Sequence, residues 1–175
     1  MASCSILVDD GNLCGEAPLW DVAQQVLYWT DCVGRKFYAY DWKAQKKEIL
    51  LGNFEVNGCA LDQSGGFTFT NNSGVWFWNK KGKPVSVAST VGNVKLQLND
   101  CIADPEGRLL AGSCFYDPSA EYPLGKLFSI QPEERFGYWT KASISRMDSA
   151  SLATGALCIL PTRSRARYMP TLTTR

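Results

Sequence analysis

VLYWTD (residues 26–31) and KFYAYD (residues 36–41) are the stretches that decide the fold class of this chain. Both are rich in β-branched and aromatic residues, which favour strands. Similar runs follow at residues 67–70 and 75–78, and clusters of turn-forming residues separate them. No segment before about residue 140 has a sustained apolar period of 3.6 residues. The sequence therefore predicts an all-β chain of short strands.

A repeat narrows the choice among all-β architectures. Asp21, Asp62 and Asp104 each open a turn that leads into a strand, and they lie 41 and 42 residues apart. A further strand follows in each unit, at residues 36–41, 75–79 and 126–130. This period is the size of one four-stranded propeller blade. Because a closed ring takes about 160 to 350 residues, we expect an incomplete β-propeller of about three blades. An unclosed ring should expose apolar residues such as Trp76 and Phe128.

Composition excludes several functions. The chain has no histidine, so it cannot form a Ser-His-Asp triad, a Cys-His dyad or a His-ligated zinc site. The formal net charge is +1, which favours neither nucleic acid nor an anionic membrane as a partner. Whatever chemistry the chain performs must use carboxylates, amides, hydroxyls or a hard metal ion bound by oxygen.

The cysteines and the N-terminus indicate a cytoplasmic protein. The seven cysteines are scattered without CxxC spacing, which favours reduced thiols over a disulfide framework. Residues 1–10 lack the basic start and the long apolar stretch of a signal peptide. No apolar run reaches about 18 residues, so we expect no transmembrane helix.

The pattern changes after residue 133, and we divide the chain into propeller blades (1–133) and an irregular tail (134–175). The tail ends in basic sequence of low complexity, which can be a solvated terminus. Alternatively, the tail is translated out of frame. When the third base of each codon is joined to the first two bases of the next, the stretch from Cys158 can become HFTDSVTRTIYAYAYDT, which resembles the first blade. From Glu133 the shifted residues can likewise read GKVRVLDKGVDLEDGFG, shortly followed by SNG. Four codon pairs permit a single shifted residue, and all four agree with these two strings; they are Tyr138-Trp139 (Leu), Trp139-Thr140 (Asp), Met147-Asp148 (Gly) and Met169-Pro170 (Ala).

Two motifs carry a family resemblance over about residues 12–133. GEAPLWD at residues 15–21, followed by LYWTD at 27–31, resembles the opening blade of the senescence marker protein, regucalcin and gluconolactonase family. LND at residues 98–100, followed by ADPEGR and AGS at 103–108 and 111–113, is similar to its third blade. The resemblance implies a six-bladed propeller that hydrolyses small-molecule sugar lactones. It also implies a divalent cation on the propeller axis, which would be Ca²⁺, Zn²⁺ or Mg²⁺.

The same resemblance assigns candidate site residues. Glu16 matches the first metal ligand of the family, and Asn99 matches an Asn that contacts substrate and a metal-bound water. Gln97 replaces an Arg that contacts sugar oxygens, and Asp117 falls near an acid that contacts substrate hydroxyls. The family's Asn from an SNG motif survives here only in the shifted frame, and its Asp ligand would lie beyond Arg175. We therefore expect weak or absent metal binding and impaired activity.

Two other functions remain open on the sequence. The tetrapeptide Tyr28-Trp29-Thr30-Asp31 also resembles the repeat of lipoprotein-receptor propellers, which are binding modules. That class repeats the tetrapeptide in every blade beside cysteine-rich modules, and neither feature occurs here. The other alternative is a non-catalytic propeller fragment. The sequence does not indicate an oligomeric state.

Overall fold

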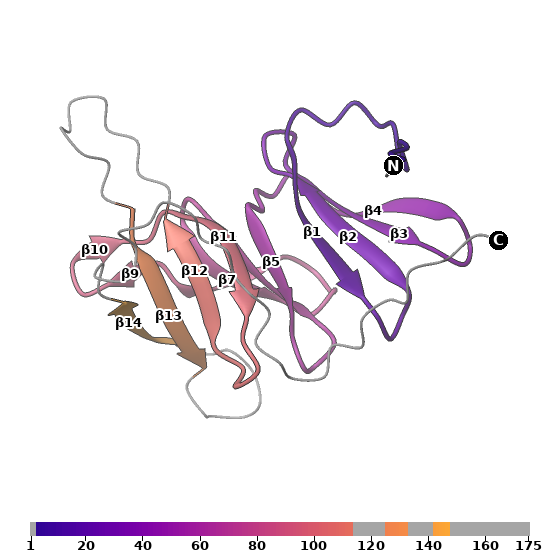
Figure 1. Ribbon diagram of the computed structural model, residues 1–175. Helices are drawn as coiled ribbons and strands as arrows, with labels where there is room; N and C mark the ends of the chain where they lie inside the picture. The colour runs from indigo at the N-terminus through magenta and orange to yellow at the C-terminus, as the bar shows by residue number, and fades with distance from the viewer. Residues whose placement is uncertain (1–2, 114–124, 133–141, 148–175) are drawn as a thin grey trace.

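The computed structural model describes residues 3–113, 125–132 and 142–147, which form three four-stranded antiparallel sheets and a hairpin (Figure 1). None of the described residues belongs to a helix that could span a membrane. The first sheet has the strands β1 (Gly15–Asp21), β2 (Val26–Asp31), β3 (Lys36–Asp41) and β4 (Lys46–Gly52). The second has β5 (Gly58–Leu61), β6 (Phe67–Asn71), β7 (Gly74–Trp78) and β8 (Val85–Ala88). The third has β11 (Leu98–Ala103), β12 (Leu109–Ser113), β13 (Leu127–Pro132) and β14 (Ala142–Met147), and the hairpin has β9 (Thr90–Val91) and β10 (Val94–Lys95).

The sheets follow one another along the chain and stand side by side, as blades do (Figure 1). The first strand of each sheet lies innermost, because β5 contacts both β1 and β11. Each sheet then adds its strands in sequence order toward the outside. The predicted all-β, partial-propeller architecture is confirmed.

The repeated aspartates form the turns that the sequence predicts. The Oδ1 atom of Asp21 accepts hydrogen bonds from the main-chain N–H groups of Ala23 (2.9 Å) and Gln24 (3.0 Å). Asp62 and Asp104 accept from main-chain N–H groups of their own turns in the same way. A short polar side chain that satisfies its own backbone favours a tight turn over a continued strand.

Strand β14 differs from the expected irregular tail. Residues 142–147 pair antiparallel with β13, from Ala142 opposite Pro132 to Met147 opposite Leu127. The physical reason is the free edge of β13, whose unpaired N–H and C=O groups need partners. The rest of the predicted tail lies outside the described residues.

Two apolar layers hold neighbouring sheets together. Between the first and second sheets, Tyr28 packs edge-on against Phe67 with ring centres 4.8 Å apart, and Phe37 packs against Phe69 at 5.0 Å. Between the second and third sheets lies a second layer of aliphatic and aromatic side chains. Its buried members are Ala60, Val75, Leu96, Leu98, Leu109, Ala111, Phe128 and Ile130.

The expectation that Trp76 and Phe128 are exposed is wrong. Phe128 is 3% exposed because it belongs to the layer between the second and third sheets. Trp76 is half-buried against Phe54, with ring centres 5.2 Å apart. Two residues that were expected to lie on open blade faces thus pack against other side chains of the described structure.

Buried threonine hydroxyls join each sheet to the next. Thr30 on β2 donates to the carbonyl oxygen of Val56 (2.7 Å), in the segment that enters the second sheet. Thr70 on β6 donates to the carbonyl oxygen of Asn99 on β11 (2.6 Å). Both threonines are fully buried, and each stands one residue before the end of its strand. A hydrogen bond from a buried threonine hydroxyl to a main-chain carbonyl therefore links the first sheet to the second and the second to the third.

Replacing Thr70 with Val keeps the shape of the buried side chain but removes the hydroxyl that donates to the carbonyl oxygen of Asn99. We expect the free energy of unfolding to fall by about 1 to 3 kcal/mol, measured by urea denaturation. Thr90→Val, at an exposed position of β9, is the matched control and should change stability by less than about 0.5 kcal/mol. Equal stability of the two variants would contradict the role given to the Thr70 hydroxyl.

Candidate functional site

Two innermost strands are bulged where the candidate residues lie. In β1 the pairing with β2 is regular at Glu16 and then shifts before Leu19. In β11 the pairing with β12 shifts between Leu98 and Cys101. A bulge turns side chains out of the regular alternation and often lies beside a functional site. Glu16 on β1 and Asn99 on β11 thus stand at irregularities of the same kind.

Gly58 lets the second and third sheets approach closely. It pairs with Thr70, as Glu16 pairs with Thr30 in the first sheet. A Cβ atom at Gly58 would lie 2.6 Å from the Thr70 hydroxyl and 2.7 Å from the main-chain nitrogen of Cys101. The bulge of β11 therefore occupies the space that a side chain at this position would need.

A cleft of about 630 Å³ opens between the three innermost strands. Its walls are mostly apolar, and its polar groups are Asn99, Asp100 and Ser113. The apolar lining residues are Ala17, Pro18, Leu19, Cys59, Ala60, Leu61, Cys101, Ile102, Ala103, Leu110, Gly112 and Leu127. Small-molecule sites commonly combine such an apolar wall with a few polar groups that fix orientation.

Of the predicted site residues, Asn99 belongs to the described lining of the cleft, whereas Glu16 and Gln97 do not. Asn99 lines the cleft, and within the described part of the chain its side-chain amide has no hydrogen-bond partner. Gln97 is exposed directly before β11, and Glu16 is exposed near the start of β1. Asp117 lies outside the described residues. The cleft also contains Asp100, which the sequence analysis did not single out.

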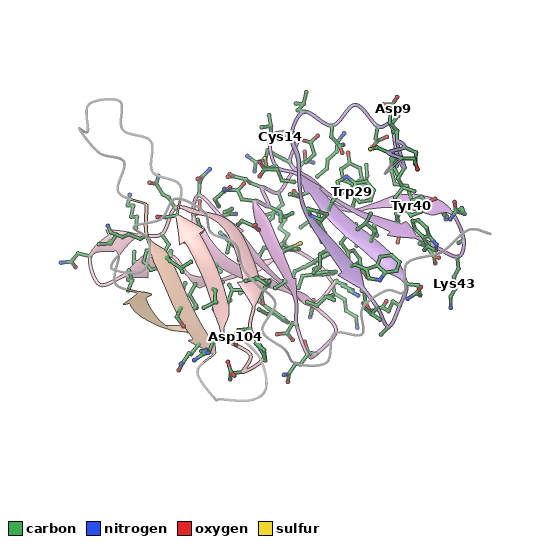
Figure 2. The ribbon with its side chains drawn as sticks, viewed as in Figure 1. Asp9, Cys14, Trp29, Tyr40, Lys43 and Asp104 are labelled. Carbon is green, nitrogen blue, oxygen red and sulfur yellow. The ribbon has the colours of Figure 1, made fainter. Side chains whose placement is uncertain are left out.

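The carboxylate of Glu16 lies beside two thiols. The Sγ atom of Cys14 is 3.6 Å from Oε1 of Glu16, and the ligand atoms of Cys14, Glu16 and Cys32 all lie within 4.8 Å of one another. This cluster could not be predicted from the sequence, because the cysteines lack a familiar metal-ligand spacing. The hairpin register contained the signal: Gly15 pairs with Asp31, which places residues 14 and 32 opposite each other. Figure 2 shows Cys14 at the end of the sheets opposite to the Asp104 turn.

Asp31 holds the two chain segments that carry these cysteines. Its carboxylate accepts main-chain hydrogen bonds from Leu13 (3.0 Å), Cys14 (3.0 Å) and Gly34 (2.8 Å). Burial alone would raise the pKa of Asp31, but these N–H donors outweigh it and lower the pKa. Burial and the neighbouring Cys14 thiol raise the pKa of Cys32 to about 11.

The described donors do not fit a hard cation. Ca²⁺ and Mg²⁺ require several oxygen ligands, whereas the cluster at Glu16 combines one carboxylate with two sulfur atoms. All five cysteines in the described part of the chain are free thiols. The donor set at Glu16 is therefore that of a softer ion.

The comparisons with known proteins identify the class. The family model described as "SMP-30/Gluconolactonase/LRE-like region" matches residues 14–169. The chain belongs to this family. The match extends past residue 133, which the sequence analysis took as the end of the blades.

Individual relatives agree with this assignment. Regucalcin of Homo sapiens is 29% identical over 138 residues, which are 75% of this chain and 46% of the relative. The 6-deoxy-6-sulfogluconolactonase of Pseudomonas putida is 27% identical over 131 residues, 74% of this chain and 44% of the relative. A gluconolactonase structure from Xanthomonas campestris matches with a TM-score of 0.65 at 19% identity, covering 81% of this chain and 49% of that one. This chain spans about half the length of the curated relatives that it matches.

Gly58→Ala tests the close approach that shapes the cleft. Because the added methyl group would meet the backbone of β11, we expect a loss of about 1 to 3 kcal/mol in unfolding free energy. Gly52→Ala on β4 is the control, since nothing lies within 4 Å of its added Cβ. Thermal unfolding of both variants checks the prediction, and an unperturbed Gly58→Ala variant would mean that β5 and β11 are farther apart.

Proposed function

We propose that this chain provides the substrate-binding edge of a sugar-lactone hydrolase. The observation that carries the proposal is the bulge of β11 at an apolar cleft beside β1 and β5. Asn99 lies in this bulge, and its side-chain amide has no hydrogen-bond partner among the described residues. A primary amide can donate and accept hydrogen bonds at once, as neighbouring sugar hydroxyls and a ring ester require. Membership of the gluconolactonase-like family supports the same substrate class.

The substrate that fits these residues is neutral. Gln97 presents an amide where the resemblance implies an arginine, and the described residues that line the cleft include no Arg or Lys to pair with an acidic sugar. Asp100 at the cleft further disfavours an anion by charge repulsion. We therefore propose an aldonolactone without an additional acidic group.

The described residues are suited to binding more than to turnover. The apolar walls can cover the C–H face of a sugar ring and exclude water, while Asn99 orients its oxygens. The chain has no histidine to act as a base. A divalent cation on the axis would polarise the lactone carbonyl, but the donors at Glu16 do not form a hard-cation site. We propose that hydrolysis requires parts of the family fold beyond the described residues.

The out-of-frame tail remains a separate proposal, supported by the codon pairs whose shifted residue is forced. Strand β14 and the family match through residue 169 both fall within the segment that this proposal would replace. Sequencing the coding DNA around the codon for Glu133 decides the question. A reading frame that continues unchanged would reject the frameshift, and an inserted or deleted base would establish it.

The binding module suggested by Tyr28-Trp29-Thr30-Asp31 has less support. Tyr28 is buried in the first apolar layer, Thr30 bonds to Val56, and Asp31 holds the neighbouring loops. Trp29 stacks on Tyr38 and donates to Asn12 (3.0 Å). These side chains serve the fold of the first sheet, which favours the lactone-binding function over recognition by this tetrapeptide.

Binding of gluconolactam, a neutral lactone analogue that resists hydrolysis, tests the proposal by calorimetry. Asn99→Ala should weaken binding about 3- to 10-fold, the worth of about one hydrogen bond. Asn93→Ala, in the turn between β9 and β10, is the control and should bind like the unchanged chain. Equal affinities for the Asn99 variant and the control would contradict a role for Asn99 in substrate binding.

A pH-stat assay with gluconolactone tests turnover by the 175-residue chain. We expect no acid release above the spontaneous rate, with or without added Ca²⁺ or Mg²⁺. Hydrolysis that disappears in Glu16→Gln would show that the chain carries a working metal site, and the proposal of a binding edge without turnover would fail.

A further inference from the structure

We propose that Cys14, Cys32 and Glu16 form a binding site for a thiophilic divalent cation such as Zn²⁺ or Cd²⁺. The site has two sulfur donors, Cys14 and Cys32, which flank the β1–β2 hairpin, and one carboxylate oxygen from Glu16 in β1. The proposal is independent of lactone binding, which was assigned to the cleft; Glu16 is not among the described residues that line the cleft. It assigns to this chain a donor set different from the oxygen ligands that the family resemblance implies.

The distance between Cys14 and Glu16 matches a tetrahedral zinc ion. With Zn–S and Zn–O bonds of about 2.3 and 2.1 Å, a tetrahedral angle places sulfur and oxygen about 3.6 Å apart. The Sγ atom of Cys14 and Oε1 of Glu16 are 3.6 Å apart. The same bond lengths place two sulfur ligands about 3.8 Å apart, and all three ligand atoms here lie within 4.8 Å. The Cys14–Glu16 pair therefore already has the spacing that the ion requires, and Cys32 lies close enough to be the third ligand.

The backbone around the site is already ordered for binding. Cys32 donates its main-chain N–H to the carbonyl oxygen of Cys14 (3.2 Å), which fixes the two residues opposite each other. Asp31 accepts from the main-chain N–H groups of Cys14 and Gly34, so both loops are tied to one carboxylate. A Cβ atom at Gly34 would overlap that carboxylate. Ligands held on restrained segments lose less conformational entropy on binding the ion.

The site is also accessible and chemically selective. Cys14 and Cys32 are partly exposed and Glu16 is exposed, so an ion can enter from solvent and keep water as a fourth ligand. Thiolate ligands favour Zn²⁺ and similar ions over Ca²⁺ and Mg²⁺. Binding releases the two thiol protons to solvent as the sulfur atoms become thiolates, while Glu16 already binds as a carboxylate.

Titration of the reduced 175-residue chain with Cd²⁺ tests the site, because thiolate-to-cadmium charge transfer absorbs in the ultraviolet. We expect the absorption to saturate at one equivalent, to be lost on addition of a chelator and to be accompanied by release of two protons. Zn²⁺ should displace the cadmium and remove the signal. A chain that shows no such absorption while its thiols are reduced would overturn the proposal.

Four variants assign the ligands. Cys14→Ser and Cys32→Ser should each reduce the absorption at one equivalent to about half or less and weaken binding at least tenfold, because one of only two sulfur donors is lost. Glu16→Gln should weaken binding but keep the absorption, which reports sulfur only; this exposed position should not affect folding. Cys4→Ser removes an exposed thiol outside the cluster and should leave the titration unchanged. An unchanged titration in both Cys14→Ser and Cys32→Ser, or its loss in Cys4→Ser, would place the metal elsewhere.

Discussion

The hydrogen bond from the Thr70 hydroxyl to the carbonyl oxygen of Asn99 is the constraint on which the candidate site depends. It joins β6, the second strand of the second sheet, to the bulge of β11, the innermost strand of the third sheet. A carbonyl at a bulge has left the regular ladder and needs another donor. Because Gly58 has no side chain, the bulge can approach closely enough to receive that bond. The position of Asn99 at the cleft is thus a consequence of contacts between the second and third sheets.

Much of the architecture could be predicted from the sequence because its signals are local. The aspartate turns are encoded by single side chains that bond to their own backbone, and the strands between them are rich in β-branched and aromatic residues. Strand β14 was not predicted because residues 142–147 have only a weak strand pattern. They form a strand because they pair with the free edge of β13. The burial of Phe128 was not predicted for a related reason: which face of a strand is covered depends on the neighbouring sheet.

The site was predicted less completely than the fold. The resemblance assigned roles to Glu16 and Asn99, which lie on the innermost strands β1 and β11. The bulges beside them are shifts in register, which leave no mark in composition or periodicity. The cluster of Cys14 and Cys32 required the exact pairing of β1 with β2. The family resemblance implies a site with hard oxygen ligands and an arginine. This chain differs from it in having Gln97 in place of the arginine, and Cys14 and Cys32 beside Glu16. The chain therefore shares the family's scaffold, while its donor groups favour a neutral ligand in the cleft and a softer ion at Glu16.

The central claim is that the cleft between β1, β5 and β11 is where this chain binds its ligand. An amide chemical-shift map recorded by NMR during titration with gluconolactam tests that claim most directly. The account predicts that the shifted amides cluster at residues 17–19, 58–61 and 99–103, which line or border the cleft. Shifts confined to the outer strands β4 and β8, or to the N-terminal segment near Trp29, would contradict it.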